Sequence, residues 1–133
     1  MNKFYLALIY GVLFGALSWA IVPFVSGKYE PFDSEAGFYT GQLLLSVLSV
    51  YLGYKHGLKY VLIFVSGIYV SSNIYPYIFG SSESRAWAIS GLITTLSLCI
   101  FPLLFGVAGK VLKISYIKYI KPLKKETPQS GPH

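Results

Sequence analysis

Charged residues, histidines and cysteines are all scarce in this chain of 133 residues. Only 12% of the residues are charged, whereas a water-soluble domain carries about 25%. A single cysteine, Cys99, excludes a disulfide within one chain and a two-cysteine redox centre. The two histidines, His56 and His133, lie far apart in the sequence, so a histidine-based triad or a metal cluster is hard to assemble. We therefore expect no enzymatic activity, no cofactor, no catalytic residue and no metal site.

Apolar residues are abundant instead, and they are gathered into four long runs. Hydrophobic residues make up 54% of the chain, and the mean hydropathy is +0.58. The runs cover residues 4–25, 37–54, 60–79 and 86–109. Each is about 20 residues long, which is the length of helix that crosses the hydrocarbon core of a bilayer. Because every backbone polar group must be satisfied within lipid, such runs form helices rather than strands. The sequence therefore predicts an all-α membrane protein with four transmembrane helices in a compact bundle.

The positions of lysine and arginine predict how these helices are oriented. Segments on the cytoplasmic side of a membrane are enriched in both residues. If the N-terminus is cytoplasmic, nine of the eleven basic residues fall on the inner side. Only Lys28 and Arg85 then lie outside, together with the acidic loop that follows the first run. We expect both ends of the chain to be cytoplasmic, in a bacterial inner membrane.

The first apolar run has a second interpretation, as a secretory signal. Lys3, the apolar stretch and the triplet Ser18-Trp19-Ala20 resemble a signal sequence with its cleavage site. The run nevertheless continues to Val25, so it is longer than the core of a signal, which has about 7–15 residues. We favour a retained helix. Cleavage after Ala20 stays the alternative and would leave three spans.

A basic tail follows the fourth run. It holds six of the eleven basic residues, and this position favours contact with a membrane surface over contact with nucleic acid. Residues 110–121 can form a helix on the inner surface, although Ile114 and Ile117 share the face of the lysines and make the amphipathic pattern imperfect. The lysines that we expect to meet anionic lipid headgroups are Lys110, Lys113, Lys118 and Lys121. We assign residues 1–121 to a single membrane domain and residues 122–133 to a disordered tail.

Small and polar residues recur at helical spacing inside the apolar runs. Their usual role is to let membrane helices pack closely, and we expect that role for most of them. A polar pathway through the bundle is a more specific hypothesis, because the amides of Gln42 and Asn73 are costly to leave unpaired in hydrocarbon. The candidate intramembrane polar residues are Gln42, Ser46, Asn73 and Thr94.

The loop between the first two runs is the exposed segment with the most varied chemistry. Asp33 or Ser34 can cap the second helix, and Glu35 in its first turn is favoured by the helix dipole. The acids of this loop also offer carboxylates to a cation, as a weaker alternative, and Arg85 can pair with one of them. The residues that we expect to form an outer interaction face are Glu30, Phe32, Asp33, Glu35, Arg85 and Trp87.

Two functions are compatible with these features. None of the four runs has Asp, Glu, Lys or Arg in its interior, which disfavours a proton-coupled pump. The favoured hypothesis is a small accessory or interaction protein that binds another membrane protein or a lipid through its helices and acidic loop. The alternative is a small channel or carrier for a small solute, working as a homo-oligomer. We expect the lipid bilayer to be a partner of the chain, and we expect no nucleic acid partner.

Overall fold

Every regular element in the described part of the chain is a helix, as the sequence predicts. The structure is a computed structural model that describes residues 2–80, 82–126 and 131. Four of its helical segments are long and apolar enough to cross a membrane. They are α1 (Lys3–Ala20) with its continuation α2 (Val22–Ser26), α3 (Glu35–Lys55), α4 (Leu58–Phe79) and α6 (Ala88–Ser115). The prediction of an all-helical chain with four helices of this length is confirmed.

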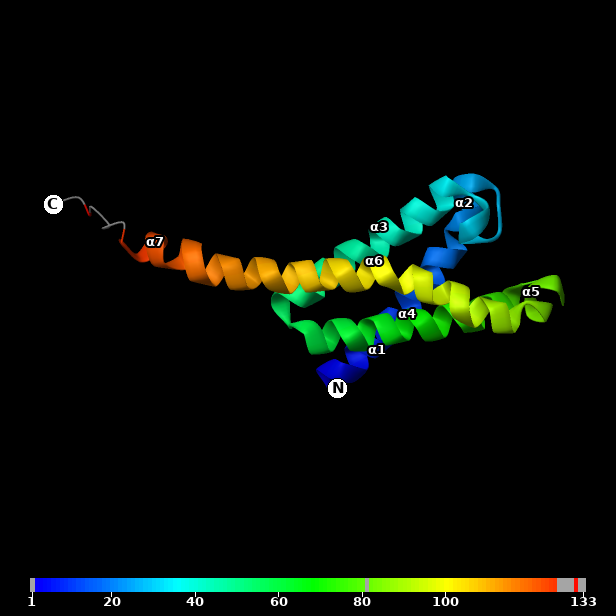
Figure 1. Cartoon of the computed structure of the whole chain (residues 1–133), viewed down its shortest axis with the longest axis horizontal. Coiled ribbons are helices and arrows are strands. Elements are labelled where there is room, and N and C mark those ends of the chain that lie inside the picture. The colour runs from blue at the N-terminus through cyan, green and yellow to red at the C-terminus, as the bar shows by residue number, and fades with distance from the viewer. Residues whose placement is uncertain (1, 81, 127–130, 132–133) are drawn as a thin grey trace.

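The remaining elements are short. Two of them flank the long helices at one end of the molecule, namely η1 (Pro31–Asp33), which precedes α3, and α5 (Ser82–Ala86), which joins α4 to α6. The other two, η2 (Tyr116–Ile120) and α7 (Lys121–Glu126), extend α6. Figure 1 shows α6, η2 and α7 as one long rod that continues well beyond the other helices.

This rod includes residues that we predicted to be disordered. Residues 122–126 are helical in α7, and the rest of the predicted tail, apart from Gly131, lies outside the described residues. We predicted disorder for residues 122–133 from their position and composition. The helix also passes Pro122, although a proline lacks an N–H and clashes with the carbonyl four residues before it. The preceding turn is a π-helical one, in which the N–H of Lys121 bonds the carbonyl of Tyr116. We attribute the continuation of the helix past the proline to this wider turn.

The first predicted helix is interrupted rather than continuous. Residues 4–25 form parts of α1 and α2, with Ile21 between them. The break lies just before Pro23, whose missing N–H removes one backbone hydrogen bond and whose ring crowds the preceding turn. Pro76 and Pro102 remove a bond in the same way, yet α4 and α6 each stay a single helix.

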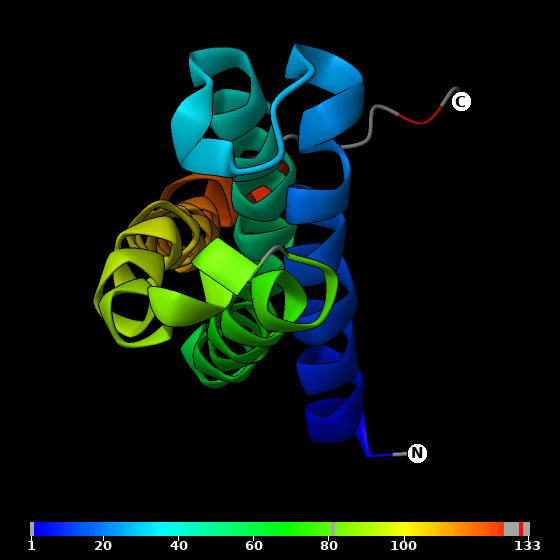
Figure 2. The ribbon, with the colours of Figure 1, turned by 90° about the vertical axis from the view of Figure 1, so that its right-hand side faces the viewer.

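The four long helices are joined as two close pairs. α1 packs on α4, α3 packs on α6, and α4 and α6 bring the pairs together (Figure 1, Figure 2). Glycines lie at both crossings, where Gly11 of α1 faces Gly67 of α4 and Gly53 of α3 faces Gly106 of α6. Small residues of this kind let two backbones approach closely. The buried apolar cluster between the helices consists of Leu45, Phe64, Ile68 and Cys99.

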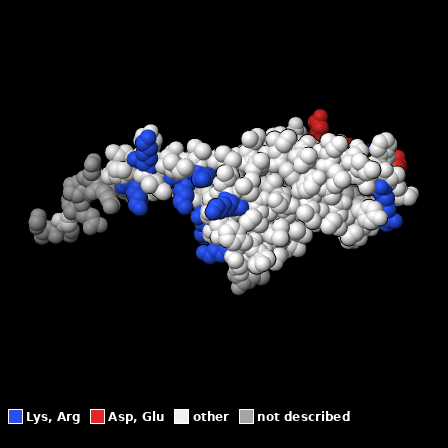
Figure 3. All heavy atoms as spheres, turned by 60° about the horizontal axis from the view of Figure 1, so that its bottom comes forward, with Lys and Arg blue, Asp and Glu red and all other residues white. Residues whose placement is uncertain are grey.

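Charged side chains lie toward the two ends of the long helices. In Figure 3 the lysines gather toward the end that carries the tail, acidic residues lie at the opposite end, and the region between them is uncharged on this face. We call these the basic end and the acidic end. The basic end holds the N-terminus, the α3–α4 connection and the tail, and the acidic end holds α5 and the loop between α2 and α3. An uncharged middle is what the core of a bilayer requires.

His56 lies in the short connection between α3 and α4. Its ring centroid is 5.3 Å from that of Tyr60. Partial burial lowers the pKa of this imidazole below its ordinary value of 6.5, and the charges of Lys3, Lys55 and Lys113 lower the pKa further. The folded state therefore binds this proton less tightly than the unfolded state does.

We expect the protein to lose stability as the pH falls below about 6.5, because protonation of His56 then favours the unfolded state. The contribution of His56 is complete above that pH and is lost as the pH falls toward the lowered pKa of the folded state. Thermal unfolding in detergent at a series of pH values measures it. The variant His56→Gln should flatten the dependence in this range, and His133→Gln, outside the described residues, should not. An equal flattening in both variants would contradict the assignment.

Candidate functional site

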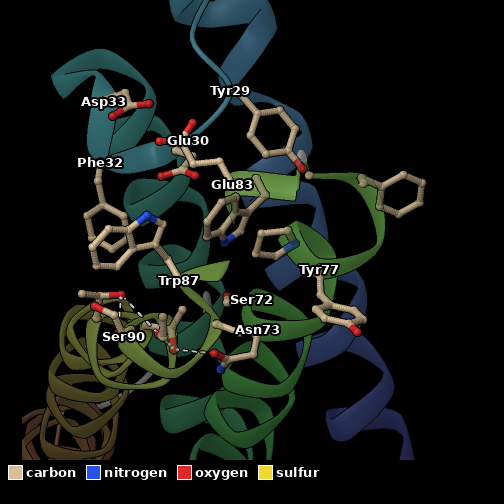
Figure 4. A pocket seen from close by; sticks show the side chains of 18 residues that line it. Tyr29, Glu30, Phe32, Asp33, Ser72, Asn73, Tyr77, Glu83, Trp87 and Ser90 are labelled. Carbon is tan, nitrogen blue, oxygen red and sulfur yellow. Dashed lines mark hydrogen bonds between the residues drawn. The ribbon is translucent and has the colours of Figure 1, made fainter. Parts of the chain in front are cut away.

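A cavity of about 740 Å³ lies at the acidic end of the molecule. Its walls come from the end of α1, the loop before α3, the last turns of α4, α5 and the first turns of α6 (Figure 4). Side chains that are distant in the sequence therefore meet around one space. Figure 4 shows Glu30, Asp33 and Glu83 toward the top of the view, and Ser72 and Asn73 toward the bottom. We call these two parts the rim and the floor of the cavity.

The loop reaches the cavity because of how α2 ends. Gly27 has a φ of 69°, a left-handed conformation that glycine adopts without strain and that turns the chain out of the helix. Ser26 Oγ donates to the carbonyl of Val22 at 2.8 Å and accepts from the N–H of Lys28 at 3.2 Å, which fixes the turn. The loop then forms η1, around the buried Pro31. The cavity residues that it carries are Tyr29, Glu30, Phe32 and Asp33.

α3 begins directly after this loop, and Ser34 is its N-cap. The N–H of Gly37 donates to Ser34 Oγ at 3.4 Å. Of the two residues that the sequence offered as caps, the structure selects Ser34, and Asp33 lines the cavity instead. Glu35 lies in the first turn, where a negative charge is favoured by the helix dipole.

The floor contains a hydrogen-bonded link between α4 and α6. Thr95 Oγ1 donates to Asn73 Oδ1 at 3.1 Å, and Asn73 Nδ2 donates to the carbonyl of Tyr69 at 2.8 Å. The single hydroxyl proton of Thr95 is shared with the carbonyl oxygen of Gly91 on its own helix, which lies 2.8 Å from Oγ1. Both groups of the Asn73 amide are therefore satisfied within the protein, as expected for an amide in a membrane helix.

We expect Asn73→Leu and Thr95→Val to destabilise the fold by similar amounts, about 0.5–1.5 kcal/mol each, because each removes the same link between α4 and α6. The double variant should be about as stable as the less stable of the two single variants, because the second substitution removes nothing further from the link. Equilibrium unfolding in mixed micelles measures all three. Thr94→Val is the control, since the Thr94 hydroxyl donates only to carbonyls of its own helix. Equal destabilisation by this control would contradict the assignment.

Three other polar groups of the cavity have no hydrogen-bond partner among the described residues. They are Ser72 Oγ, in a residue that is 1% exposed, Trp19 Nε1, in a residue that is 4% exposed, and Tyr29 Oη, a buried atom of a half-buried residue. The indole ring of Trp19 lies between those of Tyr29 and Tyr75, with centroid distances of 6.5 and 6.3 Å. An indole N–H can only donate. A buried polar group without a partner costs about 1–3 kcal/mol, so all three groups favour a polar occupant of the cavity.

The rim is acidic and aromatic. Glu30 and Asp33 come from the loop and Glu83 from α5, while Phe32 and Trp87 supply the rings. Figure 4 shows the rings of Phe32 and Trp87 below the loop carboxylates. The acidic end as a whole carries four acidic residues against two basic ones, Lys28 and Arg85.

Four of the six residues predicted for the outer interaction face line this cavity. They are Glu30, Phe32, Asp33 and Trp87. Glu35 and Arg85 are not in its lining. Arg85 Nε donates to the carbonyl of Tyr77 at 2.9 Å, and the guanidinium carbon is 5.7 Å from the centroid of the Tyr77 ring. The pairing of Arg85 with a loop acid stays a prediction.

The four candidate intramembrane residues are divided between two sites. Asn73 and Thr94 line the cavity at the acidic end. Gln42 and Ser46 line a separate groove of about 520 Å³, which is bordered by Phe101 of α6. Gln42 Oε1 is buried there and has no partner among the described residues. Within one copy of the chain these residues do not share one space.

The predicted lipid-binding lysines of the tail are not all alike. Lys110, Lys118 and Lys121 are exposed, whereas Lys113 is partly buried. Lys113 Nζ donates to the carbonyl of Lys55 at 3.5 Å, which links α6 to the α3–α4 connection. The contact with lipid headgroups stays a prediction for all four.

Sequence reasoning missed the buried part of the cavity. Trp19, Ser72 and Thr95 were not among the candidate residues, although all three line it. A signal was present for Trp19, because it follows Gly15 by four residues and so lies on the helix face that packs on α4. No such spacing distinguishes Ser72 from the other serines of α4.

Comparison with known proteins does not assign this chain to a family. Searches against protein-family models, curated proteins and solved structures found no match to this chain. The fold itself defines the class, since four helices long and apolar enough to cross a membrane are the mark of an integral membrane protein. Among the described residues, no group of three or more His, Cys, Asp or Glu is placed to hold a metal ion. The lining of the candidate site includes carboxylates, aromatic rings and hydroxyls.

Proposed function

We propose that this protein is a small accessory protein of a membrane, and that it binds another membrane protein or a lipid through the cavity at its acidic end. The observation that supports this proposal is the convergence of five segments around one cavity of about 740 Å³. That cavity combines a charged, aromatic rim with buried polar groups that lack a partner in the described part of the chain. A binding role needs no catalytic residue, and binding sites typically combine apolar walls with a few placed polar groups.

In this proposal both ends of the chain are cytoplasmic, and the acidic end faces away from the cytoplasm of a bacterial cell. The concentration of lysines at the basic end supports that orientation (Figure 3). The cavity would then open to the periplasmic side of an inner membrane.

Reporter fusions test the orientation. We expect a reporter inserted after Gly27 to be external and one inserted after Gly57 to be cytoplasmic, because the lysines hold the basic end inside. Both glycines lie in turns, with φ values of 69° and 94° and no atom within 4 Å of an added Cβ, which suits an insertion. Alkaline phosphatase and a fluorescent protein report the two sides. The reverse pattern, or an external N-terminus after cleavage at Ala20, would contradict the proposed topology.

Purification in mild detergent, followed by mass spectrometry of bound protein and lipid, tests the binding role. We expect a stoichiometric partner in the wild type that is lost in Ser90→Trp, because Ser90 lines the cavity and the larger side chain would fill it. The matched control is Ile93→Trp, one turn further along α6 at an exposed position that is not in the lining. Equal recovery in both variants would contradict the proposal.

The alternative function, an oligomeric channel or carrier, predicts a different result. A homo-oligomer that conducts a small solute in liposomes would replace the accessory role. Changing Gln42 and Asn73 to Leu would abolish that flux if they line a pathway.

A further inference from the structure

The rim and the floor of the cavity differ in chemistry, and this difference indicates what the cavity binds. We propose that its ligand is an organic ammonium group with a hydrogen-bond acceptor nearby, and that the ammonium lies at the rim while the acceptor meets the buried donors of the floor. This inference rests on the proposed function, since it names the chemical class that the same cavity takes.

The rim provides the negative charge. Asp33 comes from the loop and Glu83 from α5, both side chains are exposed, and no ion pair is found for either among the described residues. Glu30 adds a third carboxylate to the same rim. Of the two basic residues at this end, Arg85 lies against Tyr77. A cleft lined by one sign of charge concentrates ligands of the opposite sign.

The aromatic rings distinguish an organic ammonium from a metal ion. Phe32 and Trp87 line the cavity below the loop acids (Figure 4), and a ring face attracts an ammonium within about 6 Å of its centroid. A hard metal ion instead needs several oxygen ligands gathered around it. The described residues hold no group of three His, Cys, Asp or Glu close enough to form such a set. The rim therefore fits a cation that carries carbon.

The buried polar groups of the cavity can donate hydrogen bonds to an acceptor on the ligand. Trp19 Nε1–H and the Ser72 and Tyr29 hydroxyls are buried atoms that lack a partner among the described residues, and all three residues line the cavity. The amide of Asn73, which could have accepted from a ligand, is already bonded to Thr95 and to the α4 backbone. Trp19 Nε1–H can only donate and the hydroxyls can donate as well, so an ester, carboxylate or phosphate oxygen satisfies these groups.

Two sources supply this chemistry. The ethanolamine or choline headgroup of a phospholipid carries an ammonium a few bonds from a phosphate oxygen, and soluble amines with an ester or acid group carry the same pair. Both fit a cavity at the end of membrane-crossing helices, and the two are separated by the lipid composition in which binding is measured.

The test uses the full chain in nanodiscs of phosphatidylglycerol, which has no ammonium group. Isothermal titration compares acetylcholine with 3,3-dimethylbutyl acetate, in which carbon replaces the charged nitrogen, after subtraction of empty nanodiscs. We expect acetylcholine to bind about tenfold more tightly or better, since charge and ring faces both favour it. Equal affinity of the two compounds would overturn the proposal, and so would a failure of acetylcholine to bind.

Acid-to-amide variants locate the charge. Asp33→Asn combined with Glu83→Gln should lower the affinity for acetylcholine by about tenfold and leave the affinity for the neutral compound unchanged. Glu35→Gln is the matched control, because Glu35 is an exposed acid of the same end that is not in the lining. If the control lowers the affinity for acetylcholine as much as the double variant does, the effect comes from overall charge and the proposed site is wrong.

A serine pair tests the floor. Ser72→Ala should weaken the binding of acetylcholine but not that of tetramethylammonium, which has no hydrogen-bond acceptor. Ser49 also has a buried hydroxyl without a partner among the described residues, but it is not in the cavity lining, so Ser49→Ala should affect neither probe. Equal losses for both probes in Ser72→Ala would show a general structural effect and would remove the floor from the proposal.

Nanodiscs that contain phosphatidylethanolamine or phosphatidylcholine identify the source. Competition with acetylcholine supports a lipid headgroup, and undiminished binding supports a soluble amine. The two proposals fail separately. If Ser90→Trp abolishes capture of the partner while no ammonium probe binds, the ligand class is wrong and the binding role stands. If Ser90→Trp changes neither capture nor probe binding, the cavity has no binding role.

Discussion

Gly53→Leu is expected to prevent the chain from forming a stable fold, because Gly53 lies where α3 crosses α6. An added Cβ would lie 2.9 Å from the carbonyl carbon of Gly106 and would overlap its oxygen. Extra methylenes in a packed core cost about 1–3 kcal/mol when side chains can move. Here the obstacle is backbone, so we expect a cost at or above the upper end of that range. Monodispersity in size-exclusion chromatography and the thermal midpoint measure the loss.

Gly91→Leu is the matched control for stability, since it places the same side chain on α6 where no atom lies within 4 Å of the new Cβ. Leucine also has a higher helix propensity than glycine, by up to about 1 kcal/mol. The control is therefore expected to be neutral or slightly stabilising. Similar behaviour of the two variants would show that α3 and α6 do not cross at Gly53.

Trp19→Ala is expected to have the next largest effect. The side chain is 4% exposed and packs between the rings of Tyr29 and Tyr75, so it holds the end of α1, the loop and α4 together. Removal of a buried aromatic side chain costs about 3–5 kcal/mol. We expect a loss near the lower end of that range in unfolding experiments, with proteolysis of the loop between α2 and α3 becoming faster.

The other tryptophan provides the comparison. Trp87 lines the same cavity but is 66% exposed, so Trp87→Ala should change stability by less than about 0.5 kcal/mol. In Trp87→Phe the only remaining indole is Trp19, and its emission should be blue-shifted, as expected for a buried ring. A red-shifted emission from that variant would contradict the burial of Trp19.

The four long helices could be predicted from the sequence because lipid imposes a simple rule. A run of about 20 apolar residues has no alternative to a helix when its backbone groups cannot bond to water. The helix ends were less predictable, because they depend on local balances. Pro23 breaks the first helix at Ile21, whereas Pro122 does not end the last one, since a π turn precedes it.

The candidate site could be predicted only on its exposed side. The acids of the rim stood out because charge is rare in this chain, and Glu30 and Asp33 were named for that reason. Trp19 and Ser72 looked like packing residues, since apolar and small side chains are the usual contacts of membrane helices. Their lack of a hydrogen-bond partner is a property of the assembled walls and has no trace in the sequence.

The sequence by itself determined the class of this protein, its helical content and the separation of charge into two ends, because composition and run length decide how a chain partitions into lipid. Only the tertiary structure decided which polar residues share a space. Asn73 and Thr94 face the cavity at the acidic end, while Gln42 and Ser46 face another groove. The reason is physical: helix pairing follows the fit of small residues such as Gly53 against Gly106, and that fit depends on two surfaces at once.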